Sequence, residues 1–172
     1  MMLQGIKTRH DYSLEFLRSH TKGDEMILDL GFVNDLSCKM KRLGFFVYNT
    51  RYDLDLDPDR LELESYDVVT AFEILEHLIE PAQVLKRLSG MLLASVPLDV
   101  WFSPAHWTAN PYEQHYHEFY PQQFDKLLYH CGWEIIEKKK ARIVKRIGIR
   151  QALSVLFPRY YFVYAQKTRR GK

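Results

Sequence analysis

The stretch that decides the fold runs from residue 26 to residue 78. It opens with residues 26–31 (MILDLG), an apolar run that ends in Asp-Leu-Gly. It closes with a second apolar run, residues 67–72 (DVVTAF), followed by residues 73–78 (EILEHL). Short apolar runs that end at glycine or at an acidic residue, with amphipathic segments between them, are typical of buried parallel strands joined by crossover helices. The stretch therefore predicts an α/β fold.

The same two patterns continue on both sides of this stretch. Apolar residues at helical spacing predict a helix at 10–20 and further helices after Asn34 or Asp35, Pro81 and Pro121, which suit helix starts. Strands are predicted at 26–30, 45–49, 67–72, 91–96, 133–137 and 160–165. This alternation predicts helices on both faces of a mostly parallel sheet.

The composition predicts one globular domain over residues 1–172, with an N-terminal helical segment at 10–23. The chain is 47% hydrophobic and 14% aromatic, which excludes a disordered protein. No apolar run approaches the ~18 residues of a transmembrane helix, and the N-terminus lacks the apolar core of a signal peptide. Two cysteines, Cys38 and Cys131, fit a reduced cytoplasmic protein, and we expect both to be buried apolar residues.

The charge is distributed unevenly along the chain. Residues 1–137 hold all 22 acidic residues and 12 of the 24 lysines and arginines, whereas residues 138–172 hold the other 12 and no acid. Such a basic C-terminal segment, with apolar residues at helical spacing over 143–157, suits an anionic membrane, a lipid-linked substrate or, less well, a nucleic acid. It equally suits an ordinary crossover helix with a solvated face, and both interpretations stay open.

Residues 26–78 also carry a resemblance to a known family. The sequence resembles class I S-adenosylmethionine (SAM) dependent methyltransferases, of the small-molecule group whose fourth strand runs into Glu-x-Leu-Glu-His, here residues 73–77. The resemblance covers residues 24–138 and implies a Rossmann-like three-layer sandwich with an antiparallel last strand. Ligands of such sheets bind beyond the carboxyl ends of the strands. That places residues 29–31, 72–73 and 96–97 around one crevice.

The cofactor loop departs from the family pattern. The family continues Gly-x-Gly-x-Gly, so that bare backbone can approach the amino-acid end of SAM. Here Val33 stands where the second glycine belongs, and Asp35 stands near the third. A β-branched residue resists positive φ, and a strained φ costs roughly 1–3 kcal/mol. The loop therefore predicts weakened SAM binding, or a plain strand-to-helix turn that binds no cofactor.

A second departure follows the second strand. The family places an acid there to bind both ribose hydroxyls, but this chain reads Asn49-Thr50-Arg51. The stretch from there to Tyr66 is too short for the usual helix and third strand, so we expect one crossover to be missing. The alternation in residues 53–57 (DLDLD) predicts a solvated strand edge. Asp53 or Asp55 would be displaced ribose or adenine contacts.

The resemblance implies a cofactor-binding set drawn from three strand ends. Carried over to this chain, Glu73 and Glu76 face the pocket, and His77 orients the turn or lies near the substrate. Local capping of a helix N-terminus explains the same acids without any ligand. The residues predicted to bind SAM are Asp29, Gly31, Asp53, Asp55, Phe72, Glu73 and His77.

Residues 98–120 form an aromatic segment that we expect to cover the substrate. The predicted substrate-binding residues are Trp101, Trp107, Tyr112 and Tyr116. Histidine titrates near neutral pH, so the candidate general bases are His106, His115 and His117. His115 and His117 are two residues apart, so on a strand they would share one face and could both bind a metal. The segment 115–119, however, resembles the family's His-x-x-Glu-Phe-like segment, which favours a lid or packing role. We therefore predict no metal.

Two functions follow from these patterns. The first is methyl transfer from SAM to a hydroxyl, amine or carboxylate of a small or lipid-linked metabolite, with a histidine as base. The second is a degenerate methyltransferase fold without SAM chemistry, which acts as a binding or scaffold module for an anionic partner. The residues 73–78 and the aromatic segment favour the first, whereas the altered loop and the missing ribose acid favour the second.

Overall fold

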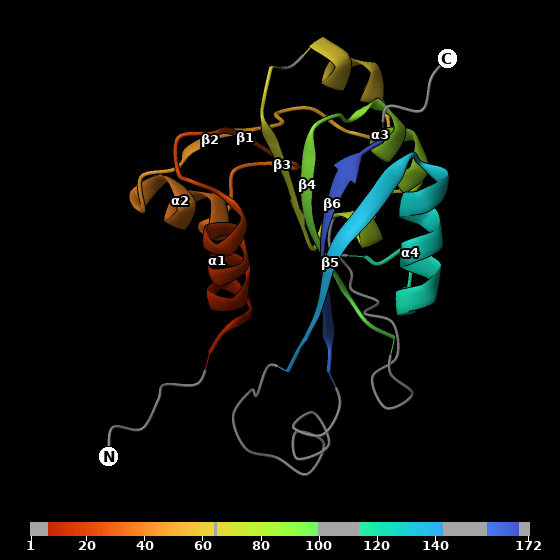
Figure 1. The fold of residues 1–172 in the computed structure, drawn as a ribbon. Coiled ribbons are helices and arrows are strands. Elements are labelled where there is room, and N and C mark those ends of the chain that lie inside the picture. Colours follow the sequence, from red (N-terminus) through yellow and green to blue (C-terminus); the bar gives the residue numbers. More distant parts are fainter. Residues whose placement is uncertain (1–6, 64, 100–113, 143–157, 169–172) are drawn as a thin grey trace, which may run out of the picture.

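The computed structural model describes residues 7–63, 65–99, 114–142 and 158–168. Six strands form one sheet in the order β2-β1-β3-β4-β6-β5 (Figure 1). They are β1 (Met26–Asp29), β2 (Phe46–Asn49), β3 (Val68–Phe72), β4 (Met91–Pro97), β5 (Trp133–Ala141) and β6 (Tyr160–Lys167). The first four strands are parallel, and β6 lies antiparallel between β4 and β5. The predicted mostly parallel sheet with an antiparallel last strand is confirmed.

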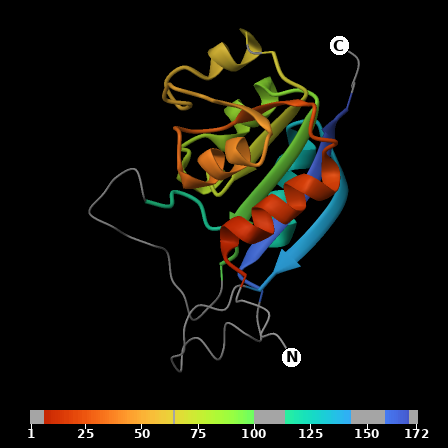
Figure 2. The same ribbon diagram turned by 90° about the vertical axis from the view of Figure 1, so that its left-hand side faces the viewer.

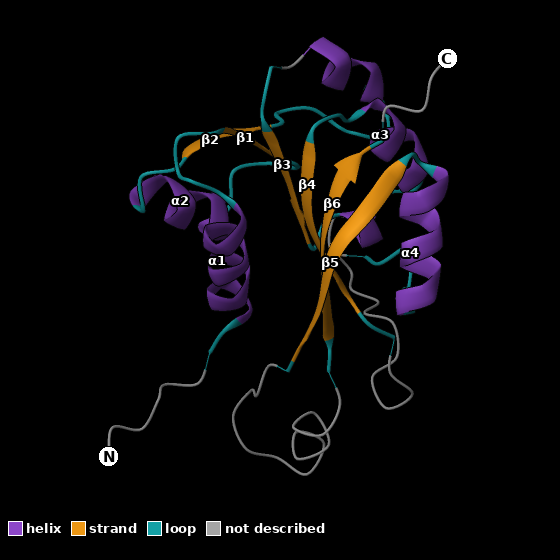
Figure 3. Cartoon of the chain, viewed as in Figure 1, coloured by secondary structure: helices purple, strands orange, loops and turns teal. Residues whose placement is uncertain are grey.

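Helices cover both faces of this sheet, as Figure 3 shows. The helices α1 (Arg9–His20) and α2 (Asp35–Arg42) pack on one face, where Ile27 and Val68 meet Phe16 and Met40. Figure 2 shows α1 lying across that face. The helices α3 (Pro81–Arg87) and α4 (Pro121–His130) and the 3-10 helix η1 (Pro58–Leu63) cover the other face.

Consecutive strand residues face opposite layers, because side chains alternate along a strand. Ile27 belongs to the core under α1 and α2, whereas its neighbour Leu28 belongs to the core under α3 and α4. Val68 and Val69 divide in the same way. Both faces of the strands are therefore buried, which explains their continuous apolar runs and confirms the three-layer sandwich.

The connection from β2 to β3 holds no further strand among the described residues 50–63 and 65–67. The predicted loss of one crossover is confirmed, and β2 is an edge strand that exposes Phe46 and Tyr48. The predicted strand edge at 53–57 is wrong, because residues 54–56 form a turn. The Asp53 carboxylate accepts hydrogen bonds from two backbone N–H groups of this turn. As a result Leu54 is buried, while Leu56 is exposed.

Several smaller predictions are also settled. Asn34 caps α2, since its side chain accepts hydrogen bonds from the N–H groups of Leu36 and Ser37. Cys131 is buried, but Cys38 is exposed on α2, which corrects its expected burial. The strand β5 extends to Ala141, beyond its predicted end at residue 137, because β6 pairs with it along its length.

The basic segment predicted at 138–172 therefore begins inside β5, and its amphipathic part at 143–157 lies outside the described residues. Of the helices that the structure describes, none is long and apolar enough to cross a membrane.

Lys167, at the end of β6, joins three elements. Its Nζ donates hydrogen bonds to the carbonyl oxygens of Leu85 (2.9 Å), Lys86 (3.1 Å) and Cys131 (3.0 Å), at the carboxyl ends of α3 and α4. These carbonyls lie where a helix leaves its oxygens without intrahelical partners, and the helix dipole favours a cation there. The ammonium also lies 4.7 Å from the ring centre of Trp133. Burial lowers the pKa of Lys167.

We expect Lys167→Met to lower the free energy of unfolding by about 2–3 kcal/mol, because three carbonyls lose a charged donor while the aliphatic stem remains. Chemical denaturation followed by circular dichroism measures the effect. The control is Lys140→Met on the neighbouring β5, where the lysine is exposed. Equal stability of the two variants would contradict the role of Lys167.

Candidate functional site

A pocket of about 520 Å³ opens at the carboxyl ends of β1 and β3. Five segments line it: residues 9–10 at the start of α1, 34–36 at the start of α2, 72–73 at the end of β3, 76–77 in the 3-10 helix η2 (Leu75–His77), and His115. Its size is that of small-molecule sites in general. Of the residues predicted to bind the cofactor, Phe72, Glu73 and His77 line this pocket.

Asp29 does not line the pocket. Its buried carboxylate accepts hydrogen bonds from Thr70 Oγ1 (2.6 Å) at β3 and from Asn49 Nδ2 (2.9 Å) at β2. Burial raises the pKa of Asp29 from 3.8 to about 6, against the opposing effect of these two donors. The residue therefore ties the ends of three strands together.

Gly31 makes the turn that leaves β1. Its φ of +95° favours glycine, and a Cβ added there would lie 3.2 Å from Ile74 Cδ1. The Gly31 N–H donates to Thr50 Oγ1 at 2.7 Å. The glycine thus keeps its predicted place at the turn but does not itself line the pocket.

The strain predicted at Val33 is not found. Among the described residues, Glu73 is the only non-glycine residue with a positive φ. The side chains of Phe32 and Val33 are more than half exposed, and the chain runs directly into the Asn34 cap. The loop therefore takes a path that a β-branched residue tolerates, and the predicted strain at Val33 is wrong.

Asp53 and Asp55 lie away from the pocket. Asp53 caps the turn at 54–56, and the Asp55 carboxylate accepts hydrogen bonds from the N–H groups of Ile79 and Glu80, just before α3. At the end of β2, Asn49 donates to Asp29 and accepts from Lys41 Nζ. The described part of this region holds no acid that lines the pocket.

Glu73 adopts a φ of +54° directly after β3. Its carboxylate is 14% exposed and lies 2.7 Å from Arg9 Nη1. Arg9 is the first residue of α1, whose start is set by a capping box between Thr8 and Asp11. The ion pair places one positive and one negative group side by side in the pocket. Sequence reasoning missed Arg9, because a basic residue at a helix start carries no signal of its distant partner.

The segment 114–117 docks on η2. The Glu76 carbonyl oxygen accepts hydrogen bonds from the N–H groups of Tyr116 (2.8 Å) and His117 (3.1 Å). His77 Nδ1 lies 2.9 Å from the carbonyl oxygen of Gln114. These contacts bring His115 beside His77, with the two rings edge to face and their centres 4.8 Å apart.

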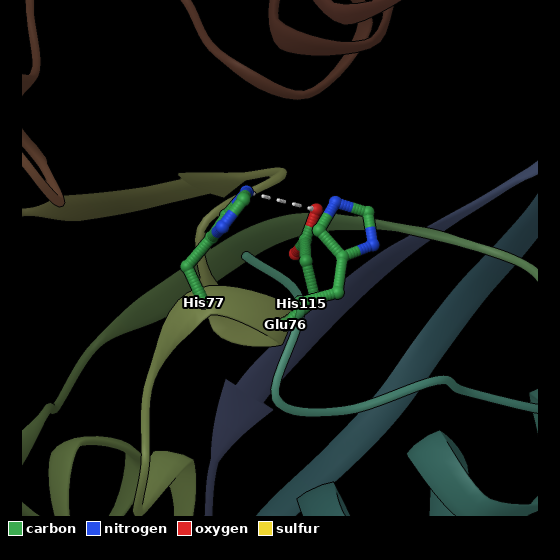
Figure 4. A group of neighbouring side chains, drawn as sticks. All are labelled: Glu76, His77 and His115. Atoms are coloured by element: carbon green, nitrogen blue, oxygen red, sulfur yellow. Dashed lines mark ion pairs between the residues drawn. The ribbon is translucent and has the colours of Figure 1, made fainter. Parts of the chain in front are cut away.

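Glu76 is the most enclosed of the pocket carboxylates. It is 1% exposed, and its Oε1 lies 3.9 Å from His77 Nε2 (Figure 4). Burial, and to a smaller extent the charge of Glu73, raises the pKa of Glu76 well above its ordinary value. The sequence placed Glu76 at the pocket but offered no sign of its complete burial.

The predicted substrate and base residues divide into three groups. His115 lines the pocket, whereas His117 lies outside it, stacked on Phe119, with its Nε2 3.1 Å from the carbonyl oxygen of Ile79. Tyr116 is half exposed. The remaining predicted residues lie outside the described ranges: Trp101, His106, Trp107 and Tyr112.

Comparison with known proteins finds likeness in structure but not in sequence. No protein-family model and no curated protein matches the chain. The structure is similar to 1,6-didemethyltoxoflavin-N1-methyltransferase of Burkholderia thailandensis, solved with 1,6-didemethyltoxoflavin and S-adenosylhomocysteine, at a TM-score of 0.64 and 15% identity. The match covers 94% of this chain and 79% of that one.

Two further structures extend the comparison. A putative SAM-dependent methyltransferase from Listeria monocytogenes matches at a TM-score of 0.59 and 13% identity, over 96% of this chain and 100% of that one. The [4+2]-cyclase SpnF matches at a TM-score of 0.57 and 12% identity, over 92% of this chain and 81% of that one. The chain thus has the fold of class I SAM-dependent methyltransferases, which confirms the resemblance at the level of fold.

The stability contribution of Asp29 should depend on pH. Its folded pKa of about 6 lies above the ordinary 3.8, so the contribution is complete below pH 3.8 and is lost as pH rises through about 6. Between pH 4.5 and 7.5 we expect wild-type protein to lose about 2 kcal/mol of unfolding free energy relative to Asp29→Asn. Urea denaturation at both pH values measures it.

The exposed Asp24→Asn variant controls for the loss of one negative charge. A difference between wild type and Asp29→Asn that is the same at both pH values would show that Asp29 does not titrate as described.

Proposed function

We propose that the protein is a SAM-dependent methyltransferase that acts on a hydroxyl, amine or carboxylate of a small or lipid-linked metabolite. The observation that carries this proposal is the Arg9–Glu73 pair in the pocket at the end of β3. The amino-acid end of SAM bears a carboxylate and an ammonium, and the pair offers a partner of opposite charge to each. The shared fold supports the proposal without establishing it.

The residues present fit the amino-acid end of SAM better than its ribose. Arg9 presents a planar guanidinium, which suits a carboxylate, and Glu73 suits the ammonium. At the ribose end, Asn49 stands at the end of β2 in place of an acid, and its amide is bound to Asp29. We therefore expect SAM to be held chiefly through its amino-acid moiety and to bind more weakly than in the family.

The chain's own residues would mainly position the acceptor. Bound SAM supplies an activated methyl group, so alignment is the main demand on the protein. Of the candidate bases predicted from the sequence, His115 is the one that the structure shows lining the pocket. We propose that Tyr116, together with Trp101, Trp107 and Tyr112 of the aromatic segment, covers the acceptor, within the cytoplasm.

The second candidate is a module without SAM chemistry that binds an anionic partner. It is favoured by three consecutive lysines, residues 138–140, which are all exposed on the edge strand β5. Lys138 forms an ion pair with Asp125, so Lys139 and Lys140 carry most of this argument. SpnF, whose name is that of a cyclase, illustrates that this fold hosts other chemistries.

Isothermal titration calorimetry with SAM and with S-adenosylhomocysteine tests the proposal. We expect saturable binding of both by wild-type protein, and about tenfold to hundredfold weaker binding by Arg9→Gln, because one charged hydrogen bond is lost. The matched control is Arg18→Gln on the last turn of the same helix, which should bind as wild type does.

Absence of heat and of any thermal shift at millimolar ligand would contradict SAM binding and favour the second candidate. Equal affinities of the Arg9 and Arg18 variants would refute the assigned position of the amino-acid end.

A further inference from the structure

The Glu76 carboxylate is buried without the partners that a buried charge requires. Its Oε2 has no hydrogen-bond partner in the described part of the chain. Its Oε1 lies 3.9 Å from His77 Nε2, which is too long for a hydrogen bond. Buried carboxylates are normally paired, hydrogen-bonded or bound to a metal. Neither of the first two conditions is fully met by the described groups, and a cation bound here would supply the missing partner.

His77 is oriented as metal-binding histidines are. Its Nδ1 lies 2.9 Å from the Gln114 carbonyl oxygen, which can only accept, so Nδ1 carries the proton. In a neutral ring, Nε2 then presents its lone pair, and this is the nitrogen nearer to Glu76. A hydrogen bond from the second ring nitrogen to a backbone carbonyl commonly fixes the tautomer of a metal ligand.

His115 completes a set of three. One ligating atom from each of Glu76, His77 and His115 lies within 4.8 Å of the others. Figure 4 shows the three side chains gathered at one point, from η2 and from the segment docked on it. Spacing along the sequence grouped His115 with His117. In the fold, His117 lies outside the pocket, and His115 lies beside His77 and Glu76, which are 38 and 39 positions earlier in the chain.

We propose that Glu76, His77 and His115 bind a divalent transition-metal ion at the wall of the pocket. Two imidazoles and one carboxylate suit zinc, iron(II) or manganese better than calcium or magnesium, which prefer oxygen ligands. Metal bonds of about 2.0–2.2 Å require the three ligating atoms to lie closer together than 4.8 Å, so the rings and the carboxylate turn inwards on binding. Three protein ligands leave positions open to the pocket.

The use of this ion rests on the proposed function. An acceptor hydroxyl bound at an open position would be held in the pocket. The metal would lower the pKa of this hydroxyl, so that its proton would pass more readily to solvent. His115 would then serve as a metal ligand and not as the general base. Binding of the ion itself does not depend on SAM, so it can be tested separately.

The test is a titration of the full-length, chelator-treated protein with Zn²⁺, and in parallel with Mn²⁺ and Mg²⁺, in the absence of SAM. We expect one equivalent of zinc per chain, and at least tenfold weaker binding by Glu76→Gln and by His115→Ala. The control is His130→Ala, because His130 is exposed at the end of α4. It should bind zinc as wild type does.

Thermal unfolding supplies a second measurement. Zinc should raise the melting temperature of wild type and His130→Ala but not that of Glu76→Gln, whose uncharged amide keeps the shape of the side chain and needs no cation. Absence of saturable zinc binding, or equal affinity in all four proteins, would overturn the site and leave Glu76, His77 and His115 as neighbouring side chains that hold no ion. Failure of SAM to bind would overturn the proposed function alone.

Discussion

The buried carboxylate of Asp29 holds the carboxyl ends of three neighbouring strands together. It lies at the end of β1 and accepts one hydrogen bond from β3, through Thr70, and one from β2, through Asn49. These contacts set the points at which the strands end and the loops of the pocket begin. Asn49, which stands where the resembled family has an acid, takes part through its amide. A second carboxylate beside Asp29 would repel it, whereas an amide donates to it.

The pocket concentrates backbone strain and unusual charge burial in a few adjacent residues. Glu73 takes a positive φ, and Glu76 is enclosed three residues later. Strain and buried charge of this kind cluster at functional sites in proteins. The surrounding sheet, buried on both faces, supplies the rigid support that such a constellation requires.

Much of the fold could be predicted because its signals are local. Apolar runs identify the buried strands, and the short interval between Asn49 and Tyr66 identifies the missing crossover. The alternation at 53–57 misled because an aspartate can cap a turn as well as line a strand. Likewise, the expected strain at Val33 assumed the family's loop path, but the Asn34 cap lets the chain leave β1 differently.

The site was less accessible to sequence reasoning because it is assembled from distant segments. Arg9 meets Glu73 across the fold, and His115 reaches η2 because residues 114–117 dock on Glu76 and His77. Neither contact leaves a pattern of spacing along the chain. The family resemblance indicated the right edge of the sheet, yet the pairing of side chains there depends on tertiary structure.

The most direct test of the pocket is an amide NMR titration of isotope-labelled protein with S-adenosylhomocysteine. We expect shift changes concentrated at residues 9–10, 31–36, 72–77 and 114–117, with β5 and α4 unchanged. Changes confined to β5 and α4, or no change at saturating ligand, would contradict a cofactor pocket at the carboxyl ends of β1 and β3.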